Sequence, residues 1–233
     1  MTAPALAPVP LSEGLWAIEG AHLCWRLGVP MPLRTVVARV GGGGLWVHAP
    51  GPLTPDLIAW LEQQGRVAHL VLPGAPLLPW LQDWQTAFPE ARLWPRDGLS
   101  EAPWRREIRP LTLRHGEACE HVFCHLPSRS AILSRLVIAV DTATLPPWAR
   151  PLVWLAGIDD SDGKPPPGLA ARLGGRKALG DLVDQVLDWG PERLILTHGR
   201  IYARDGAGEL SHAMRRIMRD RLWDRALTEA KRR

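Results

Sequence analysis

The sequence has few of the features that mark secreted, membrane-spanning or cysteine-based metal proteins. Three cysteines occur in 233 residues, an odd number with no CxxC pair, which argues against a disulfide framework and a cysteine zinc site. No run of 18 apolar residues occurs, and residues 1–16 lack a basic segment ahead of an apolar run, so neither a membrane span nor a signal peptide is predicted. We therefore expect a cytoplasmic protein with no membrane association.

Lysine is also scarce. The chain contains only Lys164, Lys177 and Lys231, so its net charge of +4 comes almost wholly from arginine. In the apolar-periodic segment 209–230, the arginines are interleaved with acidic residues, which is typical of a solvated helix face. We expect no nucleic-acid partner, whereas a small-molecule ligand is compatible with the composition. The sequence does not indicate which oligomeric state the protein adopts.

Several catalytic motifs are missing as well. There is no GxSxG turn of the kind that serine hydrolases use. The glycines at 41–44 lead into the apolar segment 45–47 and not into a helix, so they predict a hairpin turn instead of a phosphate loop. A metal hydrolase would be signalled by a cluster such as HxHxDH after a core strand, and there the chain reads PGAPLLPW at 73–80.

The order of apolar segments predicts one mixed α/β domain. Short apolar runs between residues 15 and 48 are separated by Gly or Pro, as in an antiparallel meander. Thr54 is placed as a helix N-cap, with Pro55 at the first helical position, and a strand is expected at 67–72. This strand–helix–strand order extends the meander into a mixed sheet covered by helices. We assign residues 1–14 to an N-terminal arm and residues 15–233 to a single domain.

Polar residues stand at the ends of three predicted strands. The apolar runs 122–125 and 136–140 end in His125 and Asp141, and a later run, 194–196, is followed by His198. Three ligands of this kind from separate strand ends can hold one zinc ion. Each also has a structural interpretation, because a strand-end histidine is often a hydrogen-bonded core residue and an aspartate before threonine can cap a turn.

Several motifs in this order resemble a known family. They are GLWVHAPGPLTPDL at 44–57, FPEARLW at 88–94, HVFCHLPSRS at 121–130 and LILTHG at 194–199. They resemble domain of unknown function 4336, a family of bacteria and plants that is similar to the metallo-β-lactamase superfamily. The resemblance implies an α/β fold, a four-layer αββα sandwich with two mixed sheets between helices.

The resemblance also implies roles for individual residues. His125 and His198 match two histidines of the family, whereas its histidine pair after the first core strand falls on Leu77 and Leu78. The acidic ligand falls on Arg135 in a gapless match, or on Asp141 if an insertion is allowed, and we expect Asp141. Zinc is accordingly expected to bind weakly or not at all.

Two functions follow from this degenerate set of metal ligands. The first is a metallo-β-lactamase-like hydrolase of unknown substrate, with His125, Asp141 and His198 as an incomplete metal site, and Ser128 and Arg129 beside the substrate. The second is a non-catalytic binding or scaffold protein that retains the fold. In either case we expect the three candidate metal ligands to converge at one end of the sandwich.

Overall fold

The computed structural model describes residues 7–74, 78–94, 98–160 and 163–219. In this part of the chain, eleven strands form two sheets. The first sheet contains, in spatial order, β1 (Pro8–Ser12), β2 (Leu15–Cys24), β3 (Pro30–Val40), β4 (Gly44–His48), β5 (Arg66–Val71) and β6 (Arg92–Trp94). The second contains β11 (Ile201–Tyr202), β10 (Arg193–Leu196), β9 (Ser130–Leu133), β8 (Ala118–His125) and β7 (Ile108–His115).

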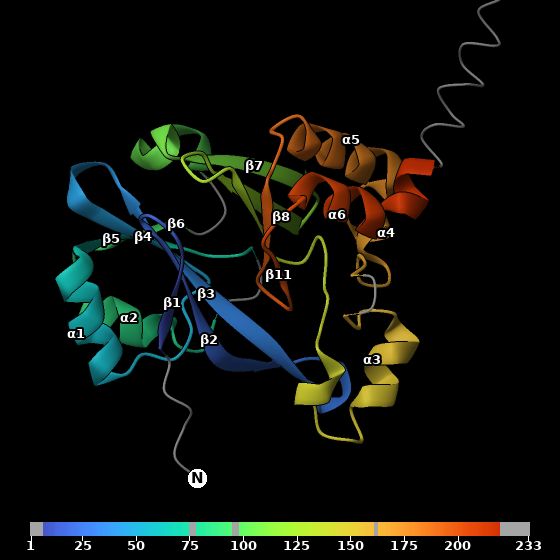
Figure 1. The fold of residues 1–233 in the computed structure, drawn as a ribbon, viewed down its shortest axis with the longest axis horizontal. Helices are drawn as coiled ribbons and strands as arrows, with labels where there is room; N and C mark the ends of the chain where they lie inside the picture. Colours follow the sequence, from blue (N-terminus) through green and yellow to red (C-terminus); the bar gives the residue numbers. More distant parts are fainter. Residues whose placement is uncertain (1–6, 75–77, 95–97, 161–162, 220–233) are drawn as a thin grey trace, which may run out of the picture.

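Helices cover the outer faces of both sheets (Figure 1). The first sheet is covered by α1 (Pro55–Gln64) and α2 (Leu81–Ala87), and the second by α4 (Leu169–Arg172), α5 (Gly175–Leu187) and α6 (Gly206–Ala213). The helix α3 (Arg150–Ala156) lies beside the turn between β2 and β3. These layers confirm the predicted αββα sandwich.

The alternation of side chains along the strands explains the layers. In β4, Leu45 and Val47 pack against the helices, whereas Trp46 points between the two sheets. In β8, Val122 faces the helices and Phe123 meets Trp46, with ring centroids 5.2 Å apart. Apolar residues on both faces of these central strands therefore fill three core layers.

Helix α1 follows the predicted signals closely. The Thr54 hydroxyl accepts a hydrogen bond from the Leu57 amide at 3.2 Å, and Pro55 occupies the first turn. Gly65 ends the helix with φ 153°, and a Cβ there would lie 2.4 Å from the Gly43 carbonyl oxygen. Only glycine fits this approach, which brings α1 back to β5 and completes the predicted βαβ unit.

Two sequence predictions differ from the structure. Residues 8–12 of the expected N-terminal arm form β1, because their backbone pairs with the edge of β2. The run 136–140 forms only isolated bridges, and the regular strand is β9, which begins at Ser130 directly after the polar residues Ser128 and Arg129. Because β9 has only four residues and begins with a serine, it lacks the longer apolar pattern that marks a strand in the sequence.

Residues 220–230 of the expected last helix lie outside the described part of the chain. Within that part, no helix is long and apolar enough to cross a bilayer.

Candidate functional site

The two sheets meet at one end of the sandwich through backbone contacts. The Arg34 amide in β3 donates to the Thr197 carbonyl oxygen just after β10, at 2.8 Å. Gly74, beyond the end of β5, forms a β-bridge with Glu120 near the start of β8. These contacts bring together segments that are far apart in the sequence, and we call this end the rim.

Arg135 is the central side chain of the rim. Its backbone amide donates to Glu120 Oε1 at 2.6 Å, and its Nε donates to Glu120 Oε2 at 3.2 Å. Its Nη2 donates to the Cys119 carbonyl oxygen. Gly74 makes room for this arrangement, because a Cβ at position 74 would lie 3.0 Å from Arg135 Nη2 and from the Cys119 oxygen. The guanidinium is therefore held firmly in place.

Glu120 is fully buried beneath Arg135. Burial raises the pKa of the Glu120 carboxyl, whereas the charge and hydrogen bonds of Arg135 act to lower that pKa. The short contacts with Arg135 match those of a carboxylate paired with a guanidinium. The arginine therefore supplies the charge that makes a buried carboxylate tolerable at the rim.

His198 lies beside this ion pair and is 8% exposed. Its Nδ1 hydrogen-bonds the Pro32 carbonyl oxygen at 2.7 Å, and since a carbonyl only accepts, Nδ1 carries the proton. Burial and, to a lesser extent, the charges of Arg135 and Arg34 lower the pKa of His198 to about 4, against the opposing effect of the Pro32 hydrogen bond. The ring is therefore neutral at pH 7, and Nε2 is a hydrogen-bond acceptor.

His48 ends β4 deeper in the same end of the sandwich. Its ring is wholly buried, stacks on Trp46 and lies within 3.3 Å of the Ser134 hydroxyl through Nε2. Its Nδ1 has no hydrogen-bond partner among the described residues. Burial, together with His121 and His198, lowers its pKa to about 3. His48 is a neutral core residue and does not reach the surface of the rim.

A cleft of about 480 Å³ opens at the rim. Its walls are mostly apolar, and its polar side chains include Arg135, Arg172 and His198. The apolar and sulfur-containing side chains come mainly from the β2–β3 region and from the segments after β5 and β9: Leu23, Cys24, Trp25, Met31, Leu33, Pro73, Leu78, Pro79, Ile138, Pro166 and Pro167. This volume is typical of a small-molecule site.

The structure does not bring His125 to the cleft. Val122, Leu133 and Leu196 lie in one row across β8, β9 and β10, and His125 and His198 extend from that row in opposite directions. At about 3.3 Å per residue, about 16 Å of sheet separates the two histidines. The predicted convergence is therefore wrong for His125, because β8 runs antiparallel to β9 and ends at the opposite end of the sheet.

His125 instead belongs to a polar turn. Its Nδ1 lies 2.7 Å from the Ser128 hydroxyl, which lies 2.8 Å from the Ser130 hydroxyl. Arg129 pairs with Glu192 at 2.7 Å. Ser128 and Arg129, the expected substrate-binding residues, thus stabilise the β8–β9 connection at the end of the sheet away from the cleft.

Asp141 does not line the cleft either. It is exposed, and its carboxylate accepts from the Ala143 amide at 2.8 Å, which caps the 3-10 turn η5 (Thr142–Thr144). Arg135, on which the gapless match places the acidic ligand, lines the cleft instead. Arg135 could have been found from that match, whereas Glu120 and Arg172 carry no signal in the sequence.

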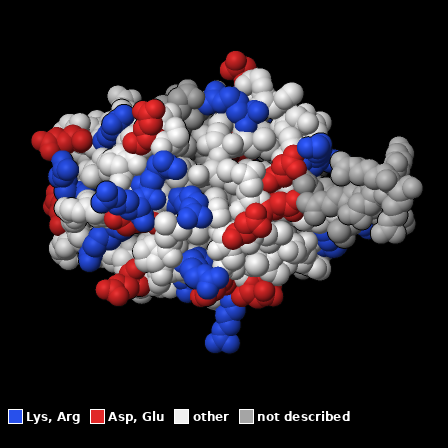
Figure 2. All heavy atoms as spheres, turned by 90° about the horizontal axis from the view of Figure 1, so that it is seen from above, with Lys and Arg blue, Asp and Glu red and all other residues white. Residues whose placement is uncertain are grey.

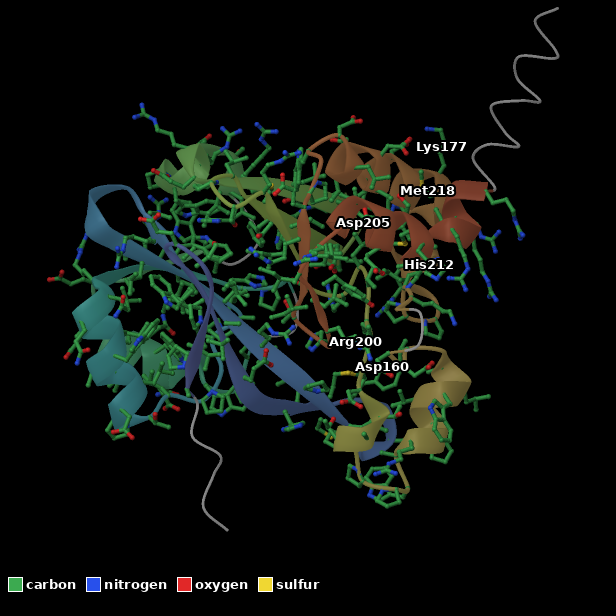
Figure 3. The ribbon with its side chains drawn as sticks, viewed as in Figure 1. Asp160, Lys177, Arg200, Asp205, His212 and Met218 are labelled. Atoms are coloured by element: carbon green, nitrogen blue, oxygen red, sulfur yellow. The ribbon has the colours of Figure 1, made fainter. Side chains whose placement is uncertain are left out.

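A second groove of about 460 Å³ lies beside α6 (Figure 3). Asp160 pairs with Arg200 at 2.5 Å, and Asp205 caps α6 by accepting from the Gly208 amide at 3.1 Å. His212 also lines this groove. Asp160, Arg200 and Asp205 thus have structural partners, so the cleft at the rim is the better candidate site.

Comparison with known proteins agrees with this architecture. Residues 13–105 match the family model described as a domain of unknown function, DUF4336. A DIM-1 metallo-β-lactamase exposed to ceftazidime superposes with a TM-score of 0.61 at 11% identity, covering 94% of this chain and all of the other. An enzyme from Erythrobacter litoralis in its mono-zinc form gives 0.54 at 14% identity, covering 92% and 99%. No curated protein matches the sequence.

This chain has the metallo-β-lactamase fold. A diflavin flavoprotein fragment from Nostoc also superposes on it, with a TM-score of 0.55 at 10% identity, covering 94% of this chain and 98% of that one. The resemblance to domain of unknown function 4336 is confirmed for residues 13–105. The motifs around His125 and His198 lie outside that match.

The residues at the rim of this metallo-β-lactamase fold do not fit a zinc ion. Leu78, which falls on one position of the family's histidine pair, is an apolar wall of the cleft, while Leu77 lies outside the described residues. Arg135, to which the gapless match assigns the acidic ligand, is a cation that lines the cleft. Among the residues that the structure describes, no three His, Cys, Asp or Glu side chains are grouped to hold a metal. Of the expected ligands, only His198 remains at the cleft.

Proposed function

We propose that this protein is a metal-independent small-molecule binding protein built on the metallo-β-lactamase fold. The observation that carries the proposal is the place of Arg135, which is anchored on Glu120 where the family would place an acidic metal ligand. A guanidinium cannot ligate zinc, because it has no lone pair to donate at neutral pH. The cleft around it has the volume and the apolar walls of a ligand site.

The hydrolytic alternative has less support. Metal hydrolases of this kind use at least three nitrogen or oxygen ligands and leave one position open for water. At the rim, Leu78 supplies no donor and Arg135 supplies a cation. Of the described residues that line the cleft, only His198 and Cys24 are of a type that binds zinc, which is fewer than three. A neutral His198 with an accepting Nε2 suits a bound organic molecule that carries a hydrogen-bond donor.

The proposal is tested with a neutral apolar fluorophore, N-phenyl-1-naphthylamine, titrated in the presence of EDTA. We expect saturable binding that EDTA leaves unchanged. Leu23→Trp, at the partly buried edge of the cleft, should weaken binding about tenfold by filling the space. The control Leu155→Trp makes the same substitution at an exposed residue of α3 that does not line the cleft, and it should have no effect. Binding that requires added zinc, or that only Leu155→Trp weakens, would contradict the proposal.

A further inference from the structure

The cleft separates its apolar and charged side chains by depth. Met31, Leu33, Leu78 and Ile138 are between 1% and 5% exposed and form the inner wall. Pro167 and Arg172 are exposed and stand at the outer edge. A molecule that fills this space therefore buries its body among apolar groups and leaves one end near a guanidinium.

The charges around the cleft have one sign. Arg135 and Arg172 line it, and no Asp or Glu side chain does so among the described residues. The charge of Arg135 is balanced from behind by Glu120. Arg172, in the last turn of α4, takes part in none of the ion pairs between described residues. Among the described residues, no ion pair therefore balances the charge of Arg172 at the entrance.

The inner end of the cleft also has a polar side chain that can accept a further hydrogen bond. His198 is more than nine-tenths buried and lines the cleft, and its Nδ1 is used by Pro32. Among the described residues, Nε2 has no hydrogen-bond partner, although it can accept one. A buried acceptor left without a partner is unfavourable, so a ligand donor at this point would add affinity.

We propose that the cleft binds an amphiphilic organic anion, with its carboxylate or phosphate at Arg172 and its apolar body against Leu33 and Ile138. This inference rests on the proposed binding function and names the ligand class. A purely apolar ligand would leave the Arg172 charge unused, and a cationic amphiphile would meet it with repulsion. A hydroxyl or N–H on the far part of the ligand would donate to His198.

Three probes with the same chain and different head groups test the inference: octanoate, 1-octanol and octylammonium. Each is titrated by calorimetry or by displacement of the neutral fluorophore. We expect octanoate to bind most tightly and octylammonium most weakly. Raising the salt concentration should weaken octanoate binding alone, because only that complex contains an exposed ion pair.

Arg172→Gln should weaken octanoate about fivefold, the effect expected for an exposed ion pair, and leave 1-octanol unchanged. Arg204→Gln is the matched control, since Arg204 is also exposed but lies outside the cleft. A further variant, Pro167→Glu, adds a negative charge at the entrance and should weaken octanoate without touching the core.

Octyl phosphate and octanoate together distinguish the two head groups, and preferential binding of either one supports the anion class. If the three probes bind equally, or if Arg172→Gln and Arg204→Gln have the same effect on octanoate binding, the proposed anionic ligand class is wrong. The proposed small-molecule binding function would survive that result. If neither the fluorophore nor any probe binds, the binding function fails as well.

Discussion

Arg135 and Glu120 form an ion pair in which the carboxylate has no exposed surface and the guanidinium side chain is 27% exposed. The backbone amide of Arg135 donates to the same carboxylate, so both Glu120 oxygens have a partner. This pair joins the start of β8 to the segment after β9. Arg135 also lines the cleft, so the stability and the chemistry of the rim both depend on this ion pair.

Removing one partner should cost much more stability than removing both. Arg135→Leu leaves a buried carboxylate without its cation and should lower the free energy of unfolding by about 3 kcal/mol. The double variant Arg135→Leu with Glu120→Leu should recover most of that loss. Urea unfolding at pH 7 measures both effects. The control Arg129→Leu breaks the exposed pair with Glu192 and should cost under about 1 kcal/mol. Equal losses for the two arginine variants would contradict this account of the buried pair.

Gly199 should tolerate no side chain. Its φ is 135°, and a Cβ would lie 2.1 Å from the Ala139 carbonyl oxygen, so Gly199→Ala must move the backbone next to His198. We expect a loss of more than about 2 kcal/mol in unfolding free energy and weaker binding of the fluorophore. Gly42→Ala is the control, because Gly42 also has positive φ, 72°, but nothing lies within 4 Å of a Cβ there. If both variants lose the same stability, backbone strain alone accounts for the loss and the close approach does not matter.

The buried histidines should make the protein sensitive to acid. Burial lowers the pKa of His48 to about 3 and that of His198 to about 4, below the ordinary value of 6.5. As the pH falls, these histidines take up protons in the unfolded chain before they do so in the folded protein. Their contribution to the free energy of unfolding is therefore complete above pH 6.5 and declines as the pH falls toward 4 and then 3. His48→Phe keeps the stacking on Trp46. We expect the free energy of unfolding of this variant to fall less on acidification than that of the wild type, by about 3 kcal/mol or less.

The pH dependence is measured by urea unfolding at several pH values between 4 and 8. His22→Gln is a matched control, since His22 is exposed and its loss should leave the profile unchanged. A His48→Phe profile as steep as that of the wild type would show that this ring does not carry the acid sensitivity.

The sequence predicted the architecture better than the site, for physical reasons. Apolar alternation and the cap at Thr54 are local signals, and they located the βαβ unit and its sheet correctly. The hairpin between β8 and β9 was missed, because β9 has only four residues and begins with a serine. Because Ser130 begins a strand, the chain reverses at 126–129 and leaves His125 at the wrong end of the sheet.

Sequence patterns also could not assign the roles of Asp141 and Arg135. A carboxylate before Thr142 has two ordinary uses, as a ligand and as a turn cap, and the structure shows the cap. In the sequence, nothing local distinguishes Arg135 from the many other arginines. Its role depends on Glu120 and Gly74, which only the folded chain brings together. Leu78, on which one histidine of the family's pair falls, is an apolar wall of the cleft.

Restoring the missing ligands should restore metal binding. Leu77→His combined with Leu78→His supplies the histidine pair that the resemblance implies, and adding Arg135→Asp replaces the cation with a carboxylate beside His198. We expect zinc retention after dialysis to rise in the double variant and to rise further in the triple variant, because each step adds a donor. Adding Asp141→Ala to the triple variant should change nothing, since Asp141 caps η5 outside the cleft. If Asp141→Ala removes zinc from the triple variant, Asp141 is a metal ligand after all.

The central claim is that the wild-type rim has become a binding cleft that does not hold zinc. Mass-spectrometric determination of zinc in the wild-type protein, purified without chelator and dialysed against metal-free buffer, tests it most directly. The account predicts well under one equivalent of zinc per chain. One equivalent that survives dialysis, and that is lost when His198 is replaced by alanine, would contradict it.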